Sequence, residues 1–323
     1  MTPDLIATVR DAFGWQVDIE VSPGPRGALG QIWRLDVGSE RYALKEIFAE
    51  PPSEALIEAE LAFTHRAAEA GVRFPMSHPD RTGHHLLTAP GGGWFRLYDW
   101  VDLRPLDLTA QATPRDVGTL LARLHSCAPG AVAEPGGGAP DRWYDTVPAA
   151  HRWTEAAEPE ASWAARLADR LSTLPELCAA VTPADELIVC HRDLHPENVL
   201  ADPAGALVVV DWDNLGPANP SRELARALFD WFSDPTPDLP AMRAMYEAYV
   251  EEGGPGRVTE QADFSMLVAS RLNFLLAQAT IARDPEAQPR HREWAERELE
   301  EALRILPTPG QLAEVLAVTR TVR

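Results

Sequence analysis

Lysine is nearly absent from this chain of 323 residues. Lysine and arginine together number 29, and 28 of them are arginine, so Lys45 is the only lysine. It stands in the segment RYALKEIF, residues 41–48. Either it is a surface lysine that a bias toward arginine codons left behind, or this position requires a compact ammonium group that a guanidinium cannot replace.

Cysteines and long apolar runs are also scarce. The three cysteines, Cys127, Cys178 and Cys190, are scattered and form no C-x-x-C pair, so neither a disulfide framework nor a structural zinc site is indicated. No apolar run approaches the ~18 residues of a membrane span, and the segment MTPDLIATVRDAFG lacks the pattern of a secretion signal. We therefore expect a cytoplasmic protein with reduced thiols and no membrane partner.

Basic residues are outnumbered by acidic ones. Against 29 Lys plus Arg stand 49 Asp plus Glu, and the formal net charge at pH 7 is −20. Binding of nucleic acid requires clustered basic side chains that neutralise phosphates, so we expect no nucleic-acid partner. The charge favours a cationic ligand, although a uniformly acidic surface that promotes solubility also explains it.

The first hundred residues are predicted to be rich in strands. One helix is predicted over 3–13, with Gly14 past its end, and a second over 54–70, which Ser53 caps and Gly71 ends. The strand patterns cover 15–21, 30–37, 41–48, 84–89 and 94–100.

Helix patterns dominate from Thr113 onward. They cover 115–127, 162–174, 221–232, 241–252, 263–282 and 292–306. We therefore predict an α+β fold with two lobes, a small β-rich lobe over 1–100 and a larger helical lobe over 101–323.

The segment LIVCHRDLHPENVLADPAGALVVVDWDN, residues 187–214, interrupts the helices. NVLAD and ALVVVD flank PAG, which predicts a β-hairpin. If Asp202 faces Leu207, then Asn198 faces Asp211, with their Cα atoms roughly 5 Å apart. Two facing oxygen ligands can bind Mg²⁺, which takes few protein oxygens and completes its octahedron with water and phosphates.

Asp193 lies in the loop before this hairpin. Its carboxylate can lie close to the metal without binding it, as a general base in phosphoryl transfer requires. Such a reaction also needs a fixed cation on the α/β-phosphates. Lys45 shares one strand face with Ala43 and Ile47, so its ammonium projects from an apolar surface that can cover a nucleotide.

A buried lysine needs an acidic partner, and the helix over 54–70 offers Glu54, Glu58 and Glu60. Glu60 lies on the mostly apolar helix face, so we predict that it pairs with Lys45. The alternatives are that Glu58 is the partner, or that Lys45 has none and Glu60 is exposed.

These motifs resemble the protein-kinase signature set. More closely, CHRDLHPENVL and VVVDWDN, with ARLHS upstream, resemble the aminoglycoside phosphotransferase and choline kinase-like family, over most of the chain. The resemblance implies a protein-kinase-like fold that uses ATP or GTP as co-substrate. It also implies the roles of the site residues. Asp193 is the catalytic base, Asn198 and Asp211 bind Mg²⁺, Lys45 binds phosphate, and Glu60 is the partner of Lys45.

Further roles follow from the same resemblance. His191 and Glu223 are expected to be structural. LYDWVDLRPLD resembles a hinge, in which Asp99 and Val101 offer backbone groups to a purine. The loop PGPRGALGQ lacks the G-x-G-x-x-G pattern, and its candidates for backbone contacts to phosphate are Gly27 and Gly30.

The family resemblance and the net charge favour a small cationic acceptor with a hydroxyl group, above all an aminoglycoside or a related basic antibiotic. Seven acidic residues of the helical part either line a cation site or form a solvated helix face: Asp230, Asp234, Asp238, Glu247, Glu251, Glu252 and Asp263. Choline, homoserine, a sugar or a macrolide stay open as acceptors, and we expect a monomer or a weak dimer.

Three other classes of protein compete with this interpretation. The first is a metal-dependent hydrolase that uses His191, Asp193 and His195 as ligands. It leaves Lys45 without a role. The second is a non-catalytic pseudokinase, and the third is a protein kinase, whose activation segment and A-P-E motif the chain lacks.

Overall fold

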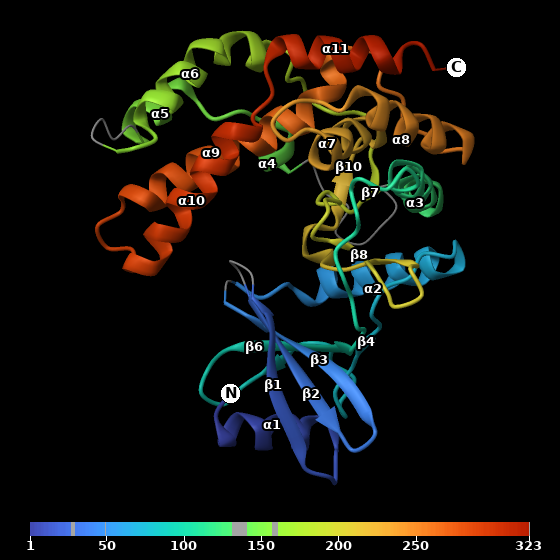
Figure 1. Ribbon diagram of the computed structural model, residues 1–323. Coiled ribbons are helices and arrows are strands. Elements are labelled where there is room, and N and C mark those ends of the chain that lie inside the picture. The colour runs from blue at the N-terminus through green and yellow to red at the C-terminus, as the bar shows by residue number, and fades with distance from the viewer. Residues whose placement is uncertain (27–29, 49, 131–140, 157–160, 323) are drawn as a thin grey trace. The chain divides into compact units, whose positions relative to one another are not determined.

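The computed structural model describes residues 1–26, 30–48, 50–130, 141–156 and 161–322 (Figure 1). The chain divides into two compact units. The first comprises Met1–Pro105 and Glu197–Asp213, and the second comprises Leu106–Pro196 and Asn214–Arg323.

An antiparallel sheet forms the centre of the first unit, in the order β1-β2-β3-β6-β4, with β5 paired to β6. Gly38 joins β2 to β3 with a φ of 63°, a conformation that glycine adopts without strain. The strands are β1 (Ile19–Arg26), β2 (Gly30–Val37), β3 (Glu40–Ile47), β4 (Ser77–His78), β5 (Leu87–Thr88) and β6 (Trp94–Asp99).

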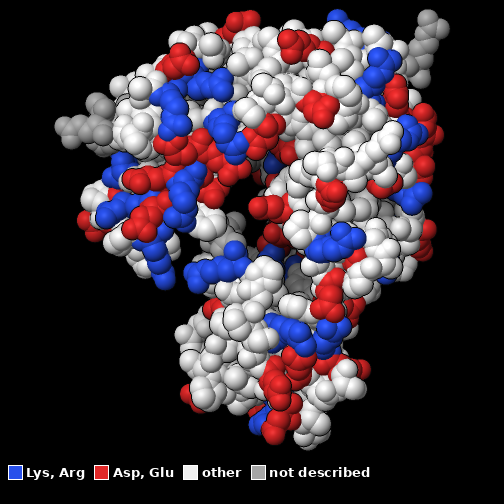
Figure 2. Space-filling model, viewed as in Figure 1, with Lys and Arg blue, Asp and Glu red and all other residues white. Residues whose placement is uncertain are grey.

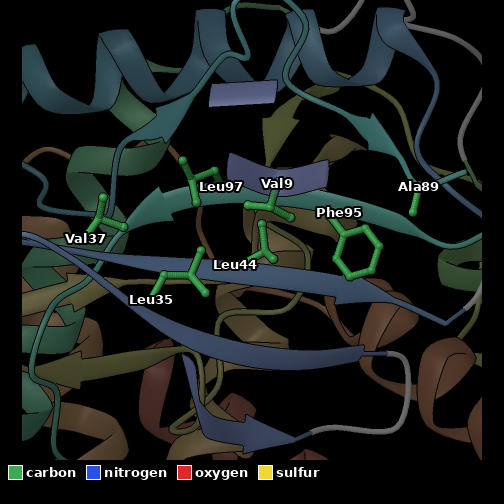
Figure 3. Packing of buried hydrophobic residues seen from close by; sticks show 7 residues of the cluster. All are labelled: Val9, Leu35, Val37, Leu44, Ala89, Phe95 and Leu97. Carbon is green, nitrogen blue, oxygen red and sulfur yellow. The ribbon is translucent and has the colours of Figure 1, made fainter. Parts of the chain in front are cut away.

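The two faces of this sheet differ in character. On one face, strand residues such as Leu44 and Leu97 pack with Val9 of helix α1 (Pro3–Phe13) in a buried apolar cluster (Figure 3). Because side chains alternate along a strand, the residue after Leu44 points to the opposite face. That face lies toward helix α2 (Glu54–Glu69) and carries Lys45 (Figure 1).

The hairpin of β8 (Val199–Ala201) and β9 (Leu207–Val209) belongs to the first unit. Bridges join Arg73 to Val208 and Arg104 to Ala201. After β9, the ring of Trp212 packs against Phe63 and Phe74. The sequence-based boundary at residue 100 assigned this hairpin to the helical lobe, because nothing in the sequence indicates these contacts with distant residues.

Helices make up most of the second unit (Figure 1). Helices α3 and α8 approach each other so closely that a Cβ on Gly118 would lie 2.1 Å from the carbonyl oxygen of Met245. A short pair of strands consists of β7 (Ile188–Cys190), which directly precedes the loop that carries Asp193, and β10 (Gly216–Ala218). The helices are α3 (Thr113–Cys127), α4 (Arg142–Asp145), α5 (Ala150–Ala156), α6 (Ala164–Ala179), α7 (Pro220–Phe232), α8 (Leu239–Glu251), α9 (Ser265–Arg283), α10 (Pro289–Ile305) and α11 (Pro309–Thr319).

The α+β prediction is confirmed, and so are both predicted helices of the first hundred residues. The first strand was placed wrongly, over 15–21 instead of Ile19–Arg26. The reason is local: after the left-handed Gly14, Trp15 stacks between the rings of Phe13 and Tyr42 and does not enter the sheet.

One helical segment of the described chain, Gln261–Arg283, is long and apolar enough to span a membrane by length and composition alone. It contains polar residues and Arg271, so it is not the uninterrupted apolar run that the sequence analysis excluded. Within this protein, 67% of the apolar window is buried, and a core helix of a soluble protein has the same pattern.

Candidate active site

Lys45 lies between two carboxylates of the first unit. Its Nζ donates to Oδ1 of Asp211 at 2.8 Å and to Oδ2 of Asp213 at 2.6 Å. Burial opposes the charged form of the ammonium, but the attraction of the two carboxylates outweighs it and raises the pKa of Lys45. The only lysine is therefore a fixed cation at the DWD motif, although Lys45 and Asp211 are 166 residues apart in sequence.

The partner of Glu60 is Arg96 in this structure, and the predicted pairing with Lys45 is wrong. The Arg96 guanidinium donates to both carboxylate oxygens of Glu60, at 2.6 and 3.0 Å. Arg96 faces Lys45 across the β3–β6 pair, so both side chains point toward α2. A planar guanidinium binds both carboxylate oxygens at once, whereas an ammonium is a point charge, and this favours Arg96.

Replacing Glu60 with glutamine should lower the free energy of unfolding by about 3 kcal/mol, because it leaves the Arg96 charge buried without a counter-charge. The side chains of Arg96 and Glu60 are only 1% and 8% exposed. Urea unfolding measures the effect. The matched control is Glu247→Gln, which removes a more exposed ion pair with Arg243 and should cost less than about 1 kcal/mol. Equal losses in the two variants would contradict the prediction.

The hairpin register differs by one residue from the prediction. Asn198 faces Val210, whose N–H donates to the Asn198 carbonyl at 2.9 Å, so Asn198 does not face Asp211. The cause is the turn: Asp202 pairs with Ala206, and Gly205 adopts a φ of 85°, as in a three-residue loop with a left-handed glycine.

The two predicted metal ligands still lie at the same end of the hairpin, because Asp211 directly follows the partner of Asn198. The φ of Asp211 is 60°, which ends the strand there. The side chains of Asp211 and Asp213 are 45% and 41% exposed, so their oxygens are accessible. The amide oxygen of Asn198 and the carboxylate oxygens of Asp211 are hard donors of the kind that Mg²⁺ takes.

In the second unit, Glu223 of α7 fixes the backbone of the loop that carries Asp193. Glu223 is 2% exposed, and its carboxylate accepts the backbone N–H of Arg192 and contacts Nε2 of His125 at 2.7 Å. Arg192 has a φ of 64°, a strained conformation for a residue other than glycine. These contacts agree with the structural role expected for Glu223, and the burial of His191 agrees with such a role for it.

Asp193 lies in this loop with partners on both carboxylate oxygens. Oδ1 accepts from Nη2 of Arg226 at 2.6 Å, and Oδ2 accepts from Nδ2 of Asn214 at 3.1 Å and lies 3.6 Å from Nε2 of His195. Burial opposes ionisation, but the nearby imidazole of His195 and the charge of Arg226 outweigh it and lower the pKa of Asp193. Asp193 is therefore deprotonated at neutral pH.

The backbone groups predicted to contact the nucleotide, in the hinge and at the two glycines, differ in whether they already have other contacts. The backbone N–H of Asp99 already donates to the carbonyl of Met76 at 3.0 Å, and its carboxylate accepts from the N–H of Met76 and contacts His78. The Val101 backbone forms no hydrogen bond with another residue in the described part of the chain. A Cβ on Gly30 would lie 2.6 Å from the Glu46 carbonyl oxygen, so packing against β3 already explains this glycine. The other candidate, Gly27, lies outside the described residues.

Of the predicted site residues, the structure brings Lys45 and Asp211 into contact within the first unit, whereas Asp193 belongs to the second. Sequence reasoning missed Asp213 as a partner of Lys45 and Arg226 as a partner of Asp193. A signal for Asp213 was present, since it is the second aspartate of the DWD motif. The sequence held none for Arg226, which lies on a helix 33 residues away from Asp193.

Comparison with known proteins agrees with these features. The model of the phosphotransferase enzyme family matches residues 20–261. No curated protein matches the chain by sequence. Solved structures show the same kinase-like fold, and three are similar over nearly the whole chain.

The first is a spectinomycin phosphotransferase in complex with ADP and spectinomycin, at 15% identity and a TM-score of 0.60, covering 100% of this chain and 99% of that one. The second is a microcompartment-associated aminopropanol kinase, at 19% identity and 0.65, covering 93% and 95%. The third is an amicoumacin kinase in complex with AMP-PNP and Ca²⁺, at 15% identity and 0.62, covering 97% of each chain.

Proposed function

This chain belongs to the phosphotransferase enzyme family, and we propose that it transfers the γ-phosphate of ATP or GTP to a hydroxyl of a small cationic molecule in a Mg²⁺-dependent reaction. The observation that carries this proposal is the contact of the only lysine with Asp211 of the DWD motif. A fixed cation beside a candidate metal ligand supplies the two kinds of positive charge that phosphates need in this chemistry.

Each site residue has its own role in the proposed reaction. Lys45 binds the α/β-phosphates, Asn198 and Asp211 hold Mg²⁺, and the Val101 backbone contacts the base. When bound, Mg²⁺ neutralises charge on the phosphate oxygens. Asp193 hydrogen-bonds the acceptor hydroxyl and takes its proton. Because its pKa is lowered, Asp193 is a weak base, which suits a loose transition state in which the hydroxyl becomes acidic only as its bond to phosphorus forms.

The acidic residues of the helical part do not support a cationic acceptor, because all seven candidates have partners within the protein. Five form ion pairs with arginines, and Figure 2 shows acidic and basic side chains next to one another on the visible face. Two cap helices, Asp238 at α8 and Asp263 at the short helix Gln261–Phe264. Two observations still favour a cationic acceptor. The net charge is −20, and one structural neighbour is named as a kinase of the amino alcohol aminopropanol.

If the acceptor is cationic, its KM should rise severalfold between low and high salt while kcat changes little. The acidic protein attracts the cation over a distance that salt shortens, to a Debye length of about 8 Å at physiological ionic strength. Initial rates at several NaCl concentrations measure this. A neutral acceptor turned over by the same enzyme is the control. A flat KM for the cation would contradict electrostatic attraction and leave the phosphotransferase proposal intact.

A direct assay tests the proposed function. The protein is incubated with Mg²⁺, ATP or GTP, and a panel of aminoglycosides, spectinomycin, aminopropanol, choline, homoserine, sugars and macrolides. Nucleoside diphosphate release and the mass of the acceptor are followed together. Phosphorylation of any acceptor supports the proposal. Failure to bind either nucleotide in the presence of Mg²⁺, or tightly bound zinc, manganese or iron, would favour the hydrolase alternative.

A further inference from the structure

Four largely buried charges of alternating sign run from the loop of Asp193 into the helices of the second unit. Arg226 of α7 donates to Oδ1 of Asp193 at 2.6 Å and, through Nε, to Oδ2 of Asp230 at 2.9 Å. The other oxygen of Asp230 accepts from Nη2 of Arg271 at 2.8 Å. Arg271 lies on α9 and also donates to the carbonyl of Ile305, at the end of α10. The catalytic loop is thus connected to three helices.

The guanidinium of Arg226 makes three different contacts. Besides the two carboxylates, its Nη1 donates to the backbone carbonyl of Arg192, the residue before Asp193. Arg226 therefore holds both the backbone and the side chain of the catalytic loop. A lysine at this position would supply one point charge and could not reach three acceptors in a plane.

The burial of these charges requires that each keeps its partners. The side chains of Arg226, Asp230 and Arg271 are 15%, 12% and 8% exposed. A buried charge that loses its partner is costly, so the four groups hold one another in a single arrangement. The guanidinium of Arg226 lies over the ring of Tyr144, with Cζ 5.8 Å from the ring centroid, and so does that of the neighbouring Arg192, at 4.6 Å.

We propose that Arg226 is a positioning residue for phosphoryl transfer, which fixes the carboxylate of Asp193 in the orientation that meets the acceptor hydroxyl, while Asp230 and Arg271 hold Arg226 in place. This inference rests on the proposed function. It also assigns the two oxygens of Asp193: Oδ1 is anchored by Arg226, and Oδ2, with longer contacts to Asn214 and His195, is the oxygen that takes the hydroxyl proton.

The test compares Arg226→Gln and Arg226→Lys with the wild type, using Mg²⁺, ATP and the panel acceptor that is turned over fastest. Arg226→Gln should lower kcat about 10²-fold, the usual effect of an ångström-scale misplacement. The KM for ATP should stay within twofold, and Arg226→Lys should recover part of the rate. The matched control is Arg243→Gln, at the more exposed ion pair with Glu247, which should change neither parameter.

A double-mutant cycle separates positioning from general stabilisation. If Arg226 acts only through Asp193, then Arg226→Gln should cost less than about twofold further in the Asp193→Asn background. Should Arg226→Gln not fold, Asp230→Asn removes the support of Arg226 more mildly and should lower kcat severalfold at unchanged KM for ATP. A folded Arg226→Gln or Asp230→Asn enzyme with normal kcat, or a loss that is fully additive with Asp193→Asn, would overturn the inference.

Crystal structures of the wild type and of Arg226→Gln provide a readout that needs no substrate. The Asp193 carboxylate should occupy one orientation in the wild type and a different one, or several, in the variant. An unchanged carboxylate would overturn the positioning role even if the enzyme is active. Conversely, a displaced carboxylate in a protein that phosphorylates nothing in the panel would count against the proposed function and not against the contact.

Discussion

Replacing Asp193 with asparagine should lower kcat by about 10²–10⁴-fold, the range that a positioned general base contributes. The amide has nearly the shape of the carboxylate and can still accept from Arg226, but it cannot take the proton of the acceptor hydroxyl. The affinity for the nucleotide should stay within a few fold, because Asp193 belongs to the second unit, whereas Lys45 and Asp211 lie in the first.

Two measurements check this expectation. Steady-state assays give kcat, and titration calorimetry with Mg²⁺ and ATP gives Kd for the nucleotide. The matched control is Asp238→Asn, because Asp238 is exposed at the start of α8 and asparagine caps a helix as well as aspartate does. A loss of less than tenfold in the Asp193 variant would remove this residue from the role of base.

The sequence was sufficient where a local pattern determined the outcome. Residues 30–37 form β2 as predicted, because alternating side chains and the turn at Gly38 specify the hairpin locally. Glu60 was placed on the buried face of its helix from the spacing of its neighbours, and it is 6% exposed. Such features depend on residues within a few positions of one another.

The sequence was insufficient where a side chain chooses among distant partners. Glu60 pairs with Arg96 because the sheet places Arg96 directly opposite Lys45, and this requires the order of the strands as well as their positions. The hairpin register depended on one residue of the turn. Because Gly205 adopts a left-handed conformation, Asn198 pairs with Val210 and not with Asp211.

The importance of the only lysine can be tested by the most conservative replacement. Lys45→Arg should lower kcat/KM by about 10²-fold or more, a loss typical of misplaced reacting groups, although the charge is kept. In the wild type, the ammonium of Lys45 lies between Asp211 and Asp213, and Arg96 is opposite Lys45 on the neighbouring strand. A guanidinium there would bind both oxygens of one carboxylate, and so occupy the oxygens that Asp211 offers to Mg²⁺.

Initial rates with varied Mg²⁺–ATP check this prediction, and the loss should include a higher KM for the nucleotide, because Lys45 and Asp211 both act on the phosphates. The reverse exchange at a surface pair, Arg34→Lys beside Asp36, is the matched control and should leave kcat/KM unchanged. Glu60→Gln should not reproduce the kinetic defect at temperatures where it stays folded, because Glu60 binds Arg96 and not Lys45. A Lys45→Arg enzyme with normal kcat/KM would mean that codon bias alone left this lysine in the chain.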